Sequence, residues 1–121
     1  MSTLAIALSS IVLSVLAQFA LKAGMSSSDV REVMAQPLAL RTLAVVLSNK
    51  LVLSGFFLYG LGAVIWLGVL SKWDVSKAYP LVGLGFALTV LIGLLAGEHV
   101  TPMRGTGVAL ICAGVWIVSR S

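Results

Sequence analysis

The sequence predicts an all-α integral membrane protein with four transmembrane helices and a short interfacial amphipathic helix between helices 1 and 2. Two observations lead to this fold class. The 121 residues are 60% hydrophobic and only 10% charged, which leaves too little polar surface to cover a water-soluble globule. The uncharged residues also gather in runs close to the roughly 20 residues with which a helix crosses a bilayer. We therefore expect one four-helix transmembrane domain over residues 1–121.

Three spans follow directly from uncharged runs at residues 4–21, 51–70 and 78–97. We expect the corresponding helices at about 3–22, 50–71 and 76–97. The first run lacks a preceding basic segment and a clear small-residue cleavage site, so we interpret it as a retained helix rather than a signal peptide.

A fourth span is predicted at about 102–119. Thr101 can cap this helix, and Pro102 fits its first turn, where a missing N–H costs nothing. Arg104 and Arg120 lie near its ends, from where long side chains reach the membrane interfaces.

The long connection between the first two spans contains a further helix. After Pro37, apolar residues recur at the spacing i, i+3, i+4 and i+7, namely at Leu40, Leu43, Ala44 and Leu47. This spacing predicts a short amphipathic helix at about 37–48 that lies in the membrane interface.

Basic residues favour one orientation only slightly. Three lie on the side with both termini: Lys72, Lys77 and Arg120. Five lie on the opposite side: Lys22, Arg31, Arg41, Lys50 and Arg104. The excess favours a cytoplasmic first connection, but insertion in both orientations stays open.

The acidic residues all fall in connections or at helix ends: Asp29, Glu32, Asp74 and Glu98. A proton-coupled exporter of cations usually has a carboxylate in mid-membrane, so this distribution argues against such an exporter. The sequence also has no catalytic triad, metal-ligand cluster or phosphate-binding loop, which predicts no enzyme, cofactor or metal site. Basic residues are spread singly, so nucleic acid is not expected as a partner.

The first span carries a polar face, because Ser10, Ser14, Gln18 and Lys22 follow one another at spacing i+4. One interpretation is helix packing, with hydroxyls that bond back to their own backbone and Lys22 extended to the headgroups. The other is the wall of a pathway, with Lys22 binding a phosphate. Gln18 requires partners in either case, because an amide in mid-membrane is costly without them.

The aromatic or hydrogen-bonding candidates of the second and third spans are Tyr59, Trp66 and Tyr79. The two tyrosines are either packed rings or substrate contacts. Glycine recurs at heptad spacing in two spans, as Gly55 with Gly62 and as Gly107 with Gly114. Each pair forms a smooth strip where another helix can approach closely, which predicts helix packing or dimerisation there.

Three motifs carry a resemblance to a known family: Ser14-Val-x-x-Gln18-x-x-x-Lys22, Ala78-Tyr79-Pro80-Leu81, and Glu98-His-Val-Thr-Pro102 before a glycine-rich last helix. They resemble the EamA-like four-helix branch of the drug/metabolite transporter superfamily. The closest resemblance is to subunits of the flippase for undecaprenyl phosphate linked to aminoarabinose. The run Gly107 to Gly114 more distantly resembles the dimerisation motif of small multidrug resistance proteins, but Ser14 and Val82 replace that family's essential glutamate and substrate-stacking tryptophan.

The resemblance implies a multi-pass protein of the bacterial inner membrane that takes part in lipid transport for lipopolysaccharide modification. It implies membrane lipid and a lipid-linked sugar as partners, and a homodimer or a heterodimer with a similar subunit. In this interpretation Lys22 and Arg104 hold the lipid phosphate, and the sugar contacts Ser14, Gln18, Tyr59 and Tyr79. The alternatives are a small multidrug-type or other EamA-like exporter of small cations or metabolites, and an accessory membrane subunit without transport.

Overall fold

The computed structural model describes residues 2–121 and confirms the helical membrane fold class. Its helices in chain order are α1 (Thr3–Met25), α2 (Ser28–Met34), α3 (Leu40–Ser48), α4 (Lys50–Leu70), α5 (Val75–Ala78), the 3₁₀ turn η1 (Tyr79–Val82), α6 (Gly83–Leu95) and α7 (Pro102–Ser119). Four stretches are long and apolar enough to cross a membrane: α1, α4, the combined stretch Val75–Leu95, and α7.

The two largest differences from the expected helix boundaries are at the end of α1 and the start of α3. α1 continues to Met25, about a turn beyond residue 22, and Gly24 is buried against the start of α4. The helix in the first connection begins at Leu40, because Ala39 is extended (φ −152°) and its N–H donates to the Thr42 hydroxyl at 3.2 Å.

The start of α4 is joined to the start of α2 by side-chain hydrogen bonds. The side-chain oxygen of Asn49, Oδ1, caps α4 by accepting hydrogen bonds from the backbone N–H groups of Leu51 and Val52. Its amide nitrogen donates to the Ser27 hydroxyl at 3.0 Å. The Ser27 hydroxyl also donates to the Asp29 carboxylate at 2.8 Å. Asp29 lies outside the membrane spans, and this hydrogen bond holds the pKa of its carboxyl below the usual value.

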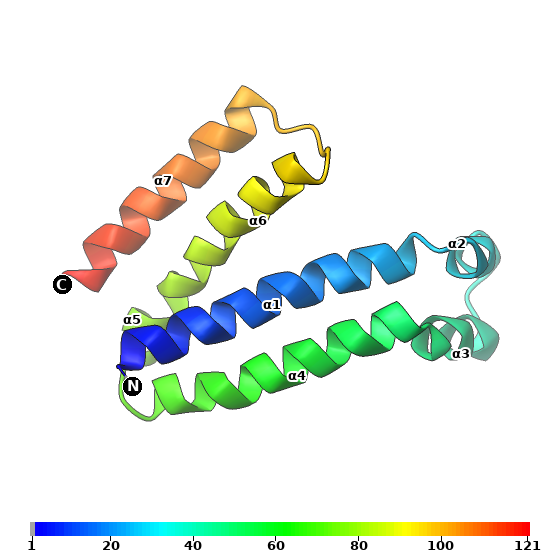
Figure 1. The fold of residues 1–121 in the computed structure, drawn as a ribbon, viewed down its shortest axis with the longest axis horizontal. Helices are drawn as coiled ribbons and strands as arrows, with labels where there is room; N and C mark the ends of the chain where they lie inside the picture. Colours follow the sequence, from blue (N-terminus) through cyan, green and yellow to red (C-terminus); the bar gives the residue numbers. More distant parts are fainter. Residues whose placement is uncertain (1) are drawn as a thin grey trace.

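The helices α1 and α4 form a hairpin and lie side by side along their length (Figure 1). Two glycines of α4 allow the close approach. A Cβ at Gly55 would lie 2.6 Å from Leu21 Cγ and 3.1 Å from the Ala17 carbonyl, and one at Gly62 would lie 3.3 Å from the Ser10 carbonyl. Gly55 and Gly62 therefore pack against α1 of the same chain.

A second hairpin consists of α6 and α7. A Cβ at Gly83 would lie 2.8 Å from Ile111 on α7, and one at Gly85 would lie 3.2 Å from Ile11 on α1. The core joins the two hairpins near the N-terminal end of α1 and includes Ile11, Val69, Leu81 and Val115. From this junction the hairpins diverge toward the end that carries α2 and α3, which gives the molecule a V shape (Figure 1).

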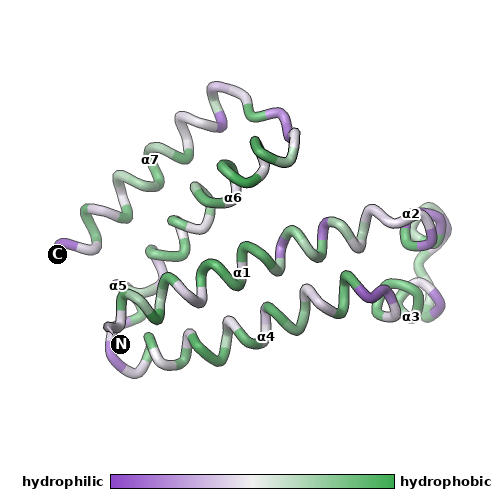
Figure 2. The backbone as a smooth tube through the Cα atoms, viewed as in Figure 1, coloured by the Kyte–Doolittle hydropathy of each residue, from purple (hydrophilic) through white to green (hydrophobic). Residues whose placement is uncertain are grey.

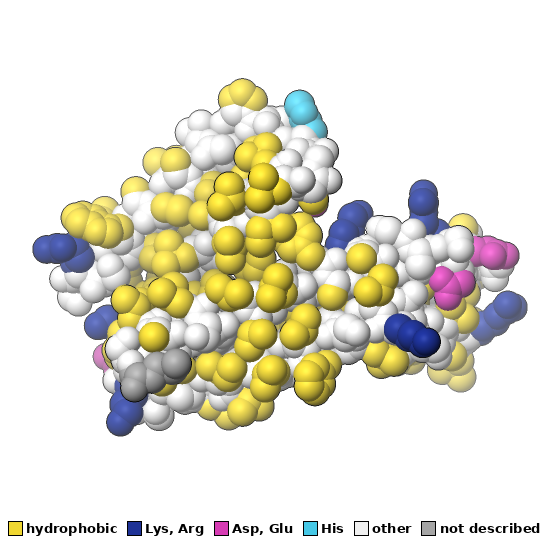
Figure 3. Space-filling model, viewed as in Figure 1, with side chains coloured by type: hydrophobic (Ala, Val, Ile, Leu, Met, Phe, Trp, Pro, Cys, Tyr) yellow, Lys and Arg dark blue, Asp and Glu magenta, His cyan; other side chains and the backbone are white. Residues whose placement is uncertain are grey.

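The outer surface is suited to lipid. Hydrophilic residues concentrate at the ends of the helices and in α2 and α3, whereas the long helices are largely hydrophobic (Figure 2). Large apolar side chains cover the visible face, and basic side chains gather at its two ends (Figure 3). Within α7 only Val115 is buried, so most of this helix is available to lipid or to another protein.

Candidate functional site

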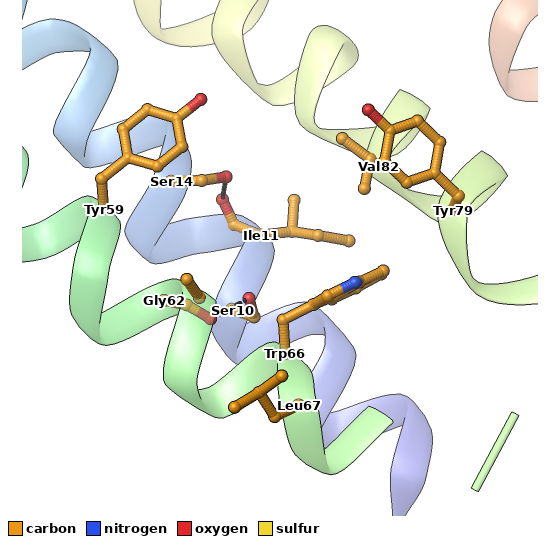
Figure 4. A pocket seen from close by; sticks show the side chains of 10 residues that line it. Ser10, Ile11, Ser14, Tyr59, Gly62, Trp66, Leu67, Tyr79 and Val82 are labelled. Atoms are coloured by element: carbon orange, nitrogen blue, oxygen red, sulfur yellow. Dashed lines mark hydrogen bonds between the residues drawn. The ribbon is translucent and has the colours of Figure 1, made fainter. Parts of the chain in front are cut away.

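A cavity of about 380 Å³ lies between the α1–α4 hairpin and η1, close to the junction of the two hairpins. Its size falls in the range of roughly 300–1,000 Å³ that is typical of small-molecule sites. The lining residues come from three elements (Figure 4): Ser10, Ile11, Ser14, Tyr59, Gly62, Ala63, Trp66, Leu67, Tyr79 and Val82.

Helical spacing explains why these residues share one space. On α4, Tyr59, Ala63 and Trp66 stand at i, i+4 and i+7, so they lie on one face. Tyr79 begins the 3₁₀ turn that precedes α6, and its ring reaches the cavity from the opposite side. The hydroxyls of Tyr59 and Tyr79 both point into the open space (Figure 4).

Three side chains on the polar face of α1 make three different kinds of hydrogen bond. The Ser10 hydroxyl is buried and donates across the hairpin to the Gly62 carbonyl at 2.7 Å. The Ser14 hydroxyl donates back to the Ile11 carbonyl of its own helix at 2.8 Å. The Gln18 amide donates to the Tyr59 hydroxyl oxygen at 2.9 Å. Because Tyr59 lines the cavity, this bond orients the Gln18 side chain toward a cavity residue.

This arrangement leaves specific hydrogen-bonding capacity for a ligand. Tyr59 accepts the bond from Gln18, and its own O–H proton can still be donated. Tyr79, which is 67% exposed, and Trp66 add another O–H and an N–H. Ser14 donates to its own helix, but its oxygen can accept a second bond. The site therefore offers hydrogen-bond donors and acceptors for a hydroxyl-rich group, and its lining contains no carboxylate.

The two predicted phosphate-binding cations lie outside the cavity. Lys22 is exposed, one helical turn beyond Gln18. Arg104 lies near the N-terminus of α7, and its guanidinium donates to the His99 carbonyl at 3.1 Å. The C-terminal end of α1 and the α6–α7 connection both lie toward the open end of the V (Figure 1). The structure thus places Ser14, Tyr59 and Tyr79 around one cavity and bonds Gln18 to Tyr59, whereas Lys22 and Arg104 are not part of the cavity lining.

Two further polar side chains line the cavity, Ser10 and Trp66, which the sequence did not assign as substrate contacts. Ser10 belongs to the same i+4 series as Ser14, and Trp66 stands seven residues after Tyr59. Both spacings are visible in the sequence. The remaining predicted positions, Gly107 and Gly114, lie on α7, where an added Cβ would meet nothing within 4 Å.

The described residues, 2–121, contain no group of three or more His, Cys, Asp or Glu side chains that could hold a metal ion. Glu98 follows α6 and folds against Gly93, where an added Cβ would lie 2.9 Å from its carboxylate oxygen. The polar groups that line the cavity are therefore the hydroxyls of serine and tyrosine and the indole of Trp66. The Gln18 amide is bonded to one of these hydroxyls, that of Tyr59.

No family model matches the chain, and no solved structure matches it. Similar curated proteins do exist. One from Pseudomonas savastanoi pv. phaseolicola, named a probable 4-amino-4-deoxy-L-arabinose-phosphoundecaprenol flippase subunit ArnE, is 45% identical over 62 residues, which are 50% of this chain and 54% of the relative. A relative of the same name from Pseudomonas fluorescens is 40% identical over 65 residues, 53% of this chain and 57% of the relative.

The matched segment thus spans only about half the length of these two relatives. A third relative is matched almost throughout. It is a probable subunit ArnF of the same flippase from Proteus mirabilis, and it is 30% identical over 118 residues, 94% of this chain and 89% of the relative. This confirms the resemblance that the sequence motifs indicate, and the chain belongs to the family of ArnE and ArnF flippase subunits.

Proposed function

We propose that the chain is a subunit of a flippase that moves a polyprenyl-phosphate-linked aminosugar, such as aminoarabinose, between the leaflets of the bacterial inner membrane. The observation that carries this proposal is the nearly full-length match to a relative named for that substrate. The cavity supports it, because its tyrosine, tryptophan and serine groups suit sugar hydroxyls.

In the proposed mechanism the headgroup enters from the open end of the V. Lys22, with Arg104, attracts the phosphate at the membrane surface, where basic side chains favour anionic groups. The sugar then reaches the hydroxyls of Tyr59 and Tyr79, next to Ser14 and Gln18. The prenyl chain stays in lipid beside the apolar outer surface, since its transfer to a polar site would cost free energy.

A second subunit completes the passage in this proposal. The V is open on one side, and α7 buries only Val115 within the chain. Gly107 and Gly114 present a strip on α7 where another helix can approach closely. The partner is a second copy of this chain or a similar subunit, and an inverted pairing would supply the symmetry that alternating access uses.

The amine of the aminosugar makes the proposal testable. Vesicles would contain the chain with its sister subunit and undecaprenyl phosphate linked to aminoarabinose on the inner leaflet. A membrane-impermeant amine reagent outside then labels only sugar that has crossed. We expect labelling to increase with time, and to stay at the level of protein-free vesicles when the chain is left out.

Paired variants test the site residues in the same assay. Gln18→Leu combined with Lys22→Ala is expected to lower the rate at least about tenfold, which corresponds to 1.4 kcal/mol of lost stabilisation. Lys50→Ala is the matched control, because Lys50 is an exposed cation at the same end of the hairpin. An unchanged rate in the double variant contradicts the site assignment, whereas failure of the unmodified pair contradicts the function.

A further inference from the structure

A second cavity, of about 390 Å³, lies at the opposite end of the molecule from Lys22 and Arg104. Its walls come from the start of α1, the α4–α5 connection, α5, η1, α6 and α7, and include Leu4, Trp73, Lys77, Leu84, Val115 and Trp116. None of its lining residues belongs to the cavity of the candidate site. The proposed function gives this second space no role.

Two cations are held over the indole rings of this cavity. The Lys77 ammonium lies 4.6 Å from the centroid of Trp73, and the Arg120 guanidinium lies 5.0 Å from the centroid of Trp116. Lys77 is half-buried and lines the cavity itself. Such cation–π contacts orient a basic group while leaving its N–H donors available to an anion.

The rest of the cavity is apolar. Leu81 and Val115 are 2% and 6% exposed, and Leu4 and Leu84 extend the hydrophobic wall. A small inorganic anion would gain nothing from this wall, whereas acyl chains would. Tryptophans and basic residues next to an apolar wall are also the groups that membrane proteins place at the headgroup level. The complementary ligand combines one negative charge with hydrocarbon.

We infer that this cavity binds an anionic membrane phospholipid, with its phosphate between Lys77 and Arg120 and its acyl chains against the leucine and valine wall. The bound lipid bridges α5 and the end of α7, next to the core that joins the two hairpins. The site depends on charge complementarity at the end with both termini, and it stands whether or not the chain transports a sugar.

Tryptophan quenching by brominated lipid tests this site. The chain and its sister subunit are placed in phosphatidylcholine vesicles, with Trp66→Phe so that Trp73 and Trp116 are this chain's reporters and with the sister subunit's tryptophans replaced. Dibrominated phosphatidylglycerol is then titrated against dibrominated phosphatidylcholine. We expect stronger quenching by the anionic lipid. Lys77→Gln should weaken its apparent affinity about fivefold, and Arg120→Gln by a similar factor.

Lys72→Gln is the matched control, because Lys72 lies in the α4–α5 connection shortly before Lys77 but does not line the cavity. Lys77→Arg keeps the charge and should retain the selectivity, which separates charge recognition from a folding defect. Equal quenching by both lipids, or equal losses in the Lys72 and Lys77 variants, would overturn the inference. Stronger displacement by undecaprenyl phosphate than by unlabelled phosphatidylglycerol would overturn it as well, and would assign the cavity to the transported lipid instead.

Discussion

The side chain of Gln18 shows how one residue couples the packing of two helices to the site. Its amide lies on an apolar helix and finds its partner in the Tyr59 hydroxyl on α4. Interhelical hydrogen bonds in membranes contribute only about 0.6 kcal/mol on average, so this bond contributes little to stability. Its larger effect is on direction, because it fixes which way the Tyr59 O–H can donate.

Because the Gln18–Tyr59 bond contributes little to stability but orients the hydroxyl, Tyr59→Phe should affect folding and transport differently. We expect the free energy of unfolding to fall by about 0.5–1.5 kcal/mol, since only one hydrogen bond is lost. The rate of headgroup transfer should fall about tenfold, because the ligand also loses a donor. Denaturant titration in micelles and the amine-labelling assay measure the two effects.

Ser54→Ala is the control on the same helix. The Ser54 hydroxyl bonds back to the Lys50 carbonyl at 2.8 Å, away from the cavity. Both measurements should remain near those of the unmodified chain. A Tyr59→Phe variant that transports normally would show that the hydroxyl does not contact the substrate.

Among the elements, the α1–α4 hairpin is the most closely packed, and glycine makes this possible. Gly55 and Gly62 bring the backbone of α4 against Leu21, Ala17 and Ser10 of α1. Close approach increases the van der Waals contact on which helix association in lipid depends. The hairpin therefore forms one wall of the cavity without help from α6 or α7.

Two alanine substitutions on α4 should have opposite effects. Gly55→Ala places a Cβ 2.6 Å from Leu21 Cγ and 3.1 Å from a backbone carbonyl, and we expect it to destabilise the chain by about 1–3 kcal/mol. Gly60→Ala meets nothing within 4 Å, and we expect it to be neutral or stabilising by up to about 1 kcal/mol. Unfolding titrations of the two variants under the same conditions compare them. Equal stabilities would contradict the close packing at Gly55.

The elements were predictable from the sequence to different degrees. Uncharged runs locate the spans, because lipid requires long apolar helices. The spacing of Gly55 and Gly62 indicates a close contact, but spacing does not say whether the neighbour is α1 or another subunit. The 3₁₀ turn at Tyr79–Val82 was not predicted as such, since it depends on packing of Leu81 and Gly83 against other helices.

Site residues on one helix were predictable from their spacing, whereas contacts between residues of different helices were less predictable. The i+4 series that includes Ser14 and Gln18 lies on the side of α1 that faces Tyr59. Trp66 was a candidate from the sequence but was not assigned to the site, because a tryptophan in a span is equally typical of simple packing. Lys22 lies outside the cavity because it is one turn further along α1 than Gln18, whereas the position of Arg104 depends on the angle between the two hairpins, which no local pattern encodes.

On the scale of the whole molecule, the last helix is the most exposed feature. Met103 is 85% exposed and Leu110 is 70% exposed, and α7 buries only Val115. Among residues 2–121, no atom lies within 4 Å of a Cβ added at Gly107 or Gly114 on this helix, apart from the helix's own backbone and chain neighbours. A second subunit would therefore find a nearly complete helical surface to pack against.

This surface predicts that bulk at the glycine strip weakens association of the subunits. Gly107→Leu and Gly114→Leu should each lower the dimerisation constant about tenfold, because a large side chain prevents close helix approach. Energy transfer between labelled subunits in vesicles measures the constant. Ala109→Leu adds bulk on another part of α7 and is the control. A dimer that is insensitive to both glycine changes would place the interface elsewhere.

The two hairpins touch mainly at one end, so few contacts within the chain would oppose a change of the angle between them in a bilayer. A hydrocarbon region thinner than the helices are long is matched by tilting, and tilting is easiest for the hairpin that is held at only one end. The width of the V would then follow the acyl chain length of the surrounding lipids. Membrane thickness would thereby regulate access to the tyrosines without any change in the protein's own contacts.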